Sequence, residues 1–287
     1  MRVALVTDST AYLPAALFAA APVPITVVPL HVVLDGHEYA EGVDITAEEL
    51  AVALRRHRRV STSRPSPQTF LGAYRAAAQT GATAIVSVHL SGAMSGTWES
   101  ATLAAQQSPV PVEVVDSRTL GMAMGYAVLS AGEAASLGTD AKTVAAIALS
   151  RSSGATVLLY VDTVEHLRRG GRIGSASALL GSALAIKPIL QVRDGSIAPV
   201  ERVRTADRAL ARMTEIAVSA AAEAVMSGGV DMAVQHLDAA ERAEALADQL
   251  RARVPGADRV VVAELGAVVG AHVGPGAIAV AVSPRPS

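Results

Sequence analysis

Strand-like and helix-like segments alternate along the first half of this sequence, and that alternation limits the fold more than any other feature. Four short runs rich in β-branched residues are bounded by turn-forming residues, as β-strands usually are: Arg2–Val6, Ile25–Leu34, Ala84–Val88 and Val112–Val115. Helical patterns lie at Ala47–His57, Gln68–Gln79, Thr97–Gln106, Gly121–Ser136 and Asp140–Ser150. Such alternation predicts an α/β fold with a mostly parallel sheet and helices on both of its faces.

The second half of the sequence has a different pattern, in which predicted strands are adjacent. The strands are Thr156–Val161, Ile186–Val192, Ile197–Val203, Met232–Gln235, Arg259–Ala263 and Ala277–Val282. The helices are Val164–Arg169, Ala176–Ala185, Ala206–Ser227 and Ala239–Arg253. The pair Asp194-Gly195 between two strands signals a hairpin. We therefore expect an N-terminal α/β domain over 1–153 and a C-terminal α+β domain over 154–287 with a mixed or antiparallel sheet.

Composition excludes several classes of function. The chain has 24 Lys and Arg against 26 Asp and Glu, no long basic run and only 3% aromatic residues, so a nucleic-acid partner is not expected. Cysteine is absent, which excludes disulfides, thiolate metal sites and cysteine nucleophiles. No signal-peptide pattern opens the sequence, and no apolar stretch is long enough to cross a membrane. We therefore expect a soluble cytoplasmic protein.

The segment 61–67 is rich in hydroxyl side chains and contains two prolines. Ser66 can cap a helix that begins at the next residue, which leaves Thr62 and Ser63 free to donate hydrogen bonds to an anion. Hydroxyls also gather in Val6–Thr10, at the end of the first predicted strand. There a ligand site and a simple helix or turn cap are equally compatible with the residues.

The segment 89–97 joins a predicted strand to a predicted helix. Its small residues let backbone N–H groups point at a ligand, and a helix N-terminus favours negative charge. Ser91 and Ser95 add hydroxyl donors, and Gly92 adds a backbone donor. We interpret the segment as an anion-binding turn, although a nucleophilic serine at 91 or 95 remains open because the sequence does not show whether a base lies beside it.

Basic side chains stand at three further places. Arg172 lies between glycines, so its guanidinium is either accessible to a ligand or part of a surface ion pair. Arg202 and Arg204 share one face of a predicted strand, which is more often a solvated face than a phosphate site. His272 lies in the predicted loop Gly270–Gly276 and is able to donate to a carboxylate, but it has no second metal ligand at suitable spacing.

These segments together resemble one known family. The matching pieces are "VTDST", "TSRPSP", "LSGAMSGTWESA", "VDSRTLGMAMG", "LRRGGRIGSASALLGSALAIKPIL", "DGSIAPVERVRT" and "GAVVGAHVGPGAIAVAV". They occur in the order of the DegV family of fatty-acid-binding proteins, the lipid-carrying subunits of bacterial fatty acid kinase. Two residues depart from the family pattern: Arg64 stands where Gln is usual, and Gly92 stands where a second Ser is usual.

The resemblance implies a DegV-like fold, with a long-chain fatty acid bound between the two domains. Its carboxylate is expected in a cradle formed by Thr62, Ser63, Ser91, Gly92, Ser95 and His272. A separate ATP-dependent kinase related to dihydroxyacetone kinases would phosphorylate this carboxylate, and Arg172, Arg202 and Arg204 would contact that kinase or the acyl phosphate. No catalytic residue, metal or cofactor is then expected in this chain, and a brief membrane contact is compatible with its ligand. The alternative is an independent serine hydrolase acting on an acyl ester.

Overall fold

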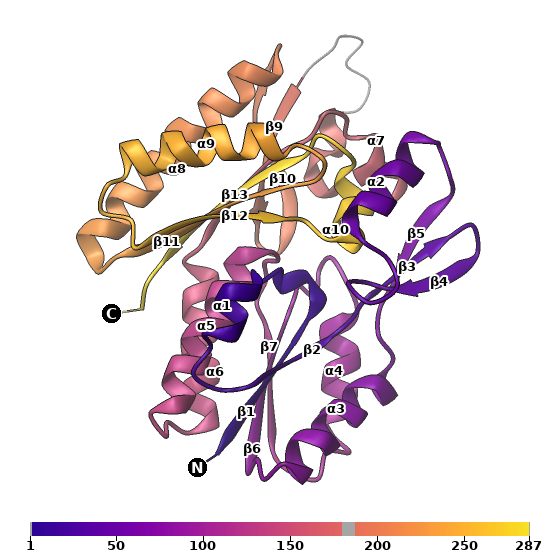
Figure 1. Ribbon diagram of the computed structural model, residues 1–287, viewed down its shortest axis with the longest axis vertical. Coiled ribbons are helices and arrows are strands. Elements are labelled where there is room, and N and C mark those ends of the chain that lie inside the picture. Colours follow the sequence, from indigo (N-terminus) through magenta and orange to yellow (C-terminus); the bar gives the residue numbers. More distant parts are fainter. Residues whose placement is uncertain (1, 180–186, 287) are drawn as a thin grey trace.

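The N-terminal half is built on a parallel sheet of four strands. The computed structural model describes residues 2–179 and 187–286. The sheet has the order β2-β1-β6-β7, and its strands are β1 (Val3–Asp8), β2 (Ile25–Val28), β6 (Ala84–His89) and β7 (Val112–Asp116). Helices α3 (Pro67–Gln79) and α4 (Thr97–Ala105) pack on one face. Helices α5 (Met122–Ser136) and α6 (Ala141–Ser153) pack on the other, which confirms the predicted α/β arrangement (Figure 1).

The C-terminal half is built on a mixed sheet of six strands. Its order is β10-β9-β8-β13-β11-β12, and the strands are β8 (Thr156–Tyr160), β9 (Lys187–Arg193), β10 (Ser196–Val203), β11 (Val230–His236), β12 (Arg259–Glu264) and β13 (Ile278–Pro284). Among the described strands of this sheet, β11 and β12 pair in parallel and the other neighbours pair antiparallel. Asp194 and Gly195 both have positive φ, at 51° and 77°, and form the predicted hairpin turn between β9 and β10.

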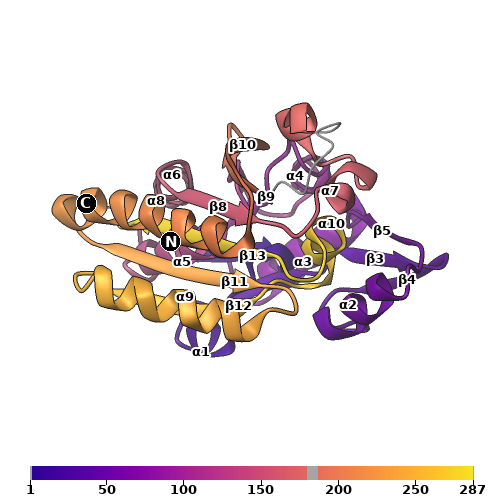
Figure 2. The same ribbon diagram turned by 90° about the horizontal axis from the view of Figure 1, so that it is seen from above.

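The two faces of this six-stranded sheet have different neighbours. Helices α8 (Ala206–Ser227) and α9 (Ala240–Arg253) lie alongside one another over one face (Figure 2). Successive side chains of a strand point to opposite faces, so Met232 and Val234 of β11 pack under these helices. Ala233 points the other way and packs with α5. The second face of the sheet is therefore turned toward the N-terminal half.

A third, antiparallel sheet of three strands stands at one side of the molecule. Its order is β4-β3-β5, with β3 (His31–Leu34), β4 (His37–Ala40) and β5 (Val60–Ser63), and helix α2 (Ala47–Arg55) follows β4. The single predicted strand Ile25–Leu34 is therefore wrong: β2 and β3 belong to different sheets and are separated at Pro29, which has no N–H to donate. The predicted loop 61–67 is also partly wrong, because Thr62 and Ser63 lie in β5.

A short helix, α10 (Ala267–Val273), replaces most of the predicted Gly/Pro loop and carries His272. Its Gly270 lies so close to Leu50 of α2 that a side chain there would collide, so the glycine permits close packing of the two helices. The remaining elements are the 3₁₀ helices η1 (Ser9–Ala11) and η2 (Gly174–Leu179) and the helices α1 (Ala15–Ala19) and α7 (Glu165–Arg169).

Two of the predicted elements reach beyond the described residues. The helix predicted over Ala176–Ala185 begins as the 3₁₀ helix η2, and its positions from 180 onward lie outside the described part of the chain. The same holds for the first residue of the strand predicted over Ile186–Val192.

A buried ion pair joins the two halves of the chain. Arg151 of α6 donates to the carboxylate of Asp231 in β11, and its Nε donates to Ser283 Oγ of β13 at 3.1 Å. Tyr126 of α5 donates to the backbone oxygen of Met232 at 2.7 Å. Because these groups are buried, each contact fixes the position of α5 and α6 against the sheet.

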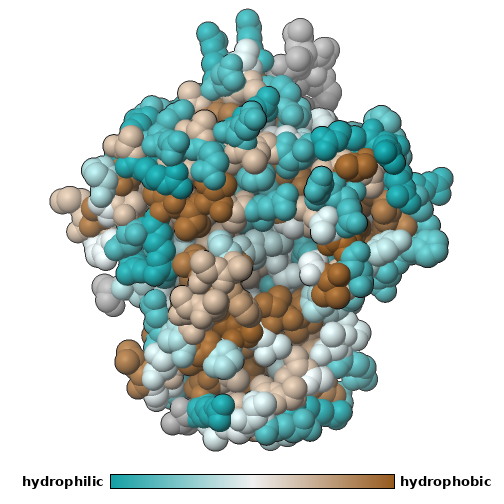
Figure 3. Space-filling model, in the orientation of Figure 1, coloured by the Kyte–Doolittle hydropathy of each residue, from teal (hydrophilic) through white to brown (hydrophobic). Residues whose placement is uncertain are grey.

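The surface of the molecule is unevenly apolar. In the view of Figure 3 the C-terminal half is largely hydrophilic, whereas brown side chains gather over the N-terminal half and along its border with the other half. Phe18 of α1 and Val27 of β2 are each 41% exposed. Among the described residues, no helix is long and apolar enough to cross a membrane.

Candidate functional site

An apolar cavity of about 440 Å³ lies where the halves meet. It faces the carboxyl ends of the parallel strands, which is where open α/β sheets bind ligands. Its floor is the second face of the six-stranded sheet, with Leu159 of β8 and Ile197 of β10. Leu90, after β6, and Leu265 and Val269, around the start of α10, extend this aliphatic lining.

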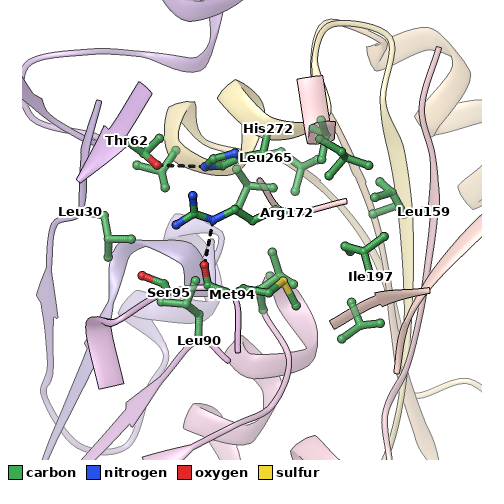
Figure 4. Close-up of a pocket in the computed structure, with 18 of the residues that line it drawn as sticks. Leu30, Thr62, Leu90, Met94, Ser95, Leu159, Arg172, Ile197, Leu265 and His272 are labelled. Carbon is green, nitrogen blue, oxygen red and sulfur yellow. Dashed lines mark hydrogen bonds between the residues drawn. The ribbon is translucent and has the colours of Figure 1, made fainter. Parts of the chain in front are cut away.

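Four polar side chains meet in one part of this cavity: Thr62, Ser95, Arg172 and His272 (Figure 4). Thr62 Oγ1 lies 2.9 Å from His272 Nε2. Arg172 Nε donates to the backbone oxygen of Met94 at 3.0 Å. In Figure 4 the Arg172 guanidinium lies between the Thr62–His272 pair and Ser95. Strand β5 and the turn after β6 therefore bring hydroxyl groups, α10 brings an imidazole and the turn after α7 brings a guanidinium to one place.

The charge of Arg172 is not compensated by an acidic side chain of the described residues. Its hydrogen bonds go to two backbone carbonyls, those of Met94 and Gly170, the second at 2.6 Å from Nη1. Within residues 2–179 and 187–286, no ion pair of Arg172 is found. Backbone carbonyls hold the guanidinium in place but leave its positive charge available, so this part of the cavity favours an anion.

The imidazole of His272 is neutral at physiological pH. Burial, together with the charge of Arg172, lowers the pKa of His272 to about 4. The ring packs directly on Gly170, where any side chain would overlap Nδ1. The ring nitrogen Nδ1 has no hydrogen-bond partner among the described residues. The contact of Nε2 with Thr62 is therefore the hydrogen bond that orients the ring.

The other residues of the predicted cradle lie at varying depths. Ser63 lines the cavity, and its hydroxyl donates to Glu38 of β4. Ser91 is only 1% exposed, and its Oγ donates to the backbone oxygen of Gly195 at 2.6 Å, which ties the turn after β6 to the β9–β10 hairpin. The backbone N–H of Gly92 donates to Asp116 at 3.1 Å. Ser91 and Gly92 are not among the residues that line the cavity.

The three predicted basic residues are not brought together. Arg172 lines the cavity beside the cradle, whereas Arg202 of β10 and Arg204 are exposed on the surface and line neither the cavity nor the depression beside it. Strand β10 ends at Val203, so Arg204 lies one residue beyond the strand on which it was predicted. A further arginine, Arg64, also lines the cavity and pairs with Glu99 of α4 at 2.8 Å.

A second depression, of about 640 Å³, adjoins the polar part of the cavity. Thr62, Arg172 and His272 line both spaces. The depression is also lined by the apolar Leu54, Val60 and Ala271 and by polar and basic groups that include His57, Arg58, Arg59, His166 and Arg169. Arg58 pairs with Asp35 and Arg169 pairs with Glu165, so part of this charge is already compensated. We call this space the basic depression.

The residues at the end of β1 serve the fold. Asp8 Oδ1 accepts from the backbone N–H of Thr10 at 3.0 Å and caps η1. Its Oδ2 lies 3.0 Å from His89 Nδ1, and His89 Nε2 lies 2.7 Å from Ser87 Oγ. This Ser–His–Asp order resembles a hydrolase triad, but all three side chains have 0% exposure, so no substrate reaches Ser87. The cap, one of the two alternatives for this segment, is therefore confirmed.

Among the described residues, no base lies beside either serine considered as a nucleophile. Ser91 Oγ donates to a backbone carbonyl, and Ser95 Oγ lies 2.9 Å from Thr97 Oγ1. Neither serine hydrogen-bonds to a histidine within the described ranges, although an activated serine requires such a base. In the same part of the chain, no group of three or more His, Asp or Glu side chains is arranged to hold a metal ion.

The chain is similar to other proteins over nearly its whole length. The profile of the DegV family, described as uncharacterised proteins, matches residues 2–285. A DegV domain-containing protein of Streptomyces coelicolor is 51% identical over 284 residues, which cover 99% of each chain. Two solved structures are also similar. A DegV family protein from Thermus thermophilus, described for its fatty acid binding, is 34% identical with a TM-score of 0.91 and coverage of 99% of this chain and 100% of its own. DegV from Bacillus subtilis, described as a fatty acid binding protein, is 30% identical with a TM-score of 0.89 and the same coverage.

Proposed function

Because this chain belongs to the DegV family, and its solved relatives are described as fatty acid binding proteins, we propose that it binds a long-chain fatty acid in the apolar cavity. The observation that carries the proposal is the meeting of an uncompensated Arg172 with the Thr62–His272 pair in an otherwise aliphatic cavity. A fatty acid has the matching chemistry, with one anionic group on a long hydrocarbon.

The hydrocarbon supplies most of the binding free energy. A chain of about 16 carbons, at roughly 0.8 kcal/mol for each buried methylene, gives about 11 kcal/mol at most. Association and ordering cost several kcal/mol of this. The cavity volume of about 440 Å³ lies within the usual range for sites that enclose small ligands. The aliphatic lining is therefore sufficient for binding, and the polar groups set the direction of the ligand.

The carboxylate would lie among Thr62, Ser95 and Arg172. With His272 neutral, its Nε2–H donates to Thr62 Oγ1, and the hydroxyl proton of Thr62 is then directed to the carboxylate. In this arrangement the unpartnered Nδ1 of His272 is an acceptor. Arg172 contributes charge, and Ser95 a second hydroxyl, so the ligand receives both neutral and charge-assisted hydrogen bonds.

The chain would present this carboxylate to a separate ATP-dependent kinase, and the chemistry would occur on that partner. The basic depression supports this step, because Thr62, Arg172 and His272 line it as well as the cavity. Arg59 there would attract the phosphate groups of the partner's nucleotide. Arg202 and Arg204, outside both spaces, would contact an acidic surface of the kinase.

The proposal is tested by native mass spectrometry of the purified protein, which is expected to show a bound long-chain acid. A delipidated sample is then titrated with acids of different length, and the kinase is added with ATP in a separate assay. If the delipidated, folded protein binds no long-chain acid, the proposal fails. If it binds the acid but no kinase phosphorylates it, only the presentation step fails.

A further inference from the structure

One polar side chain interrupts the aliphatic floor of the cavity. Gln235 lies on β11, on the same face of the sheet as Ala233, and lines the cavity among Val157, Leu159 and Ala279. It is only 3% exposed. An amide buried among aliphatic groups costs free energy unless both of its ends are hydrogen-bonded.

One end of this amide is satisfied, and that contact fixes the orientation of the other end. Gln235 Oε1 accepts from the backbone N–H of Met122, at the N-terminus of α5, at 2.8 Å. Gly121 permits the contact, because any side chain there would collide with Oε1. If Oε1 and Nε2 of the Gln235 amide were exchanged, Nε2–H would face the N–H of Met122 and two donors would meet. The amide therefore takes the orientation with Oε1 toward Met122. The Nε2 group is therefore the end that remains.

Gln235 Nε2 is buried and has no hydrogen-bond partner in the part of the chain that the structure describes. The cap on α5 does not account for this group, because capping requires only an acceptor oxygen, which a glutamate would also provide. A plain hydrocarbon chain in the cavity would leave the donor unpaired. An oxygen atom on the ligand chain would pair with it, and sites that hydrogen-bond a ligand oxygen discriminate against analogues that lack it.

We propose that the cavity is selective for a long-chain acid that carries a hydroxyl or oxo oxygen along its chain, with Gln235 Nε2 as the donor to that oxygen. This inference rests on the proposed function and names the class of ligand within it. The carboxylate is held by Thr62 and Arg172, and Gln235 supplies a second polar contact within the aliphatic part of the cavity.

The test compares hexadecanoate with a series of hydroxyhexadecanoates that differ in the position of the hydroxyl, and with the matching oxo acids. Affinities are measured by competition against a fluorescent fatty acid. In the wild type, at least one oxygenated acid is expected to bind about tenfold more tightly than hexadecanoate, which corresponds to about 1.4 kcal/mol. In Gln235→Met the preference for the oxygenated acid over hexadecanoate is expected to disappear.

A second variant separates the two ends of the amide. Gln235→Glu keeps an acceptor for the N–H of Met122 but removes the donor, so it is also expected to lose the preference. Thermal unfolding of both variants shows whether α5 remains capped. If every oxygenated acid binds the wild type no better than hexadecanoate does, the inference is overturned and Gln235 is only a cap. If the wild type binds neither hexadecanoate nor any oxygenated acid, the proposed function itself fails.

Discussion

Thr62 and His272 are 210 residues apart in the sequence, and their side chains meet at 2.9 Å in the cavity. The pair joins β5 of the small sheet to α10, so the proposed carboxylate cradle would form only when these two elements are packed together. Substitutions in and around this pair are therefore expected to change ligand affinity and stability.

Removing a hydroxyl from the cradle is expected to weaken binding. Thr62→Val and Ser95→Ala each remove one hydrogen bond to a charged carboxylate, which costs about 1–3 kcal/mol of binding free energy. Titration with a fluorescent fatty acid measures the change. Thr139→Val, in the loop between α5 and α6, is the matched control and is expected to bind as the wild type does. Unchanged affinity in both cradle variants would remove these hydroxyls from the site.

Arginines inside and outside the cavity are expected to have different effects. Arg172→Ala removes the uncompensated charge and is expected to lower fatty acid affinity by about 2 kcal/mol. Arg202→Ala and Arg204→Ala are expected to leave affinity unchanged and to slow only phosphorylation by the kinase. The exposed Arg75 of α3, replaced by Ala, is the control for both assays. Equal affinity in Arg172→Ala and the wild type would place Arg172 with the docking residues instead.

Gly170 is expected to be required for the position of His272. A methyl group at Gly170 overlaps the imidazole ring, so Gly170→Ala should displace the ring from Thr62 and reduce both ligand affinity and the free energy of unfolding, the latter by about 1–3 kcal/mol. Gly72 of α3 has open space around it, and Gly72→Ala should stabilise the helix by up to about 1 kcal/mol. Equilibrium denaturation distinguishes these opposite signs.

Stability is expected to fall on acidification from pH 6.5 to about 4. The pKa of His272 is about 4 in the folded chain and 6.5 in the unfolded chain, so the unfolded state binds more protons in this window. The loss is at most about 3 kcal/mol. His272→Gln should show a shallower decline, although burial also lowers the pKa of His166 and His236 and leaves some pH dependence. The free energy of unfolding is measured against pH for the wild type and for His272→Gln. Parallel curves for these two proteins would contradict this account.

The buried ion pair between the halves is expected to be far more sensitive than a surface pair. Asp231→Asn leaves Arg151 buried without its counter-charge and should lower the free energy of unfolding by about 3–5 kcal/mol. Asp248 pairs with Arg251 on α9 but is 74% exposed, so Asp248→Asn should cost less than about 1 kcal/mol. Chemical denaturation measures the free energy of unfolding of both variants. Similar losses in Asp231→Asn and Asp248→Asn would show that the buried pair matters no more than the surface pair.

Local patterns in the sequence predict the regular elements well. The helix predicted over Ala206–Ser227 coincides with α8, and the turn chemistry of Asp194-Gly195 correctly predicts the β9–β10 hairpin. Strand β5 was missed because Val60–Ser63 is short and polar, and its pairing with β3 is a tertiary contact that no local pattern encodes. Helix α10 was missed because Gly270 suggests a loop, although there it permits contact with Leu50.

The site was only partly predictable for the same reason. The hydroxyls of Thr62 and Ser95 were identified from segment chemistry, and both line the cavity. The placement of Arg172 beside them depends on where α7 and the following turn pack, which the sequence does not show. Gln235 was passed over as part of a strand. Its signal is a polar residue on the face of β11 that also carries Asp231 and Ala233 toward the other half.

The floor of the cavity comes from the C-terminal sheet, and most of its polar rim comes from β5 and the turn after β6. A bound fatty acid would therefore contact both halves at once. Part of its binding free energy would then stabilise the packing of one half on the other. At a ligand concentration a hundred times the dissociation constant, this linkage adds about 2.7 kcal/mol to the stability of the whole chain. The bound lipid would then stabilise the packing of the two halves against each other. Its removal by a partner would weaken that packing at the cavity from which it leaves.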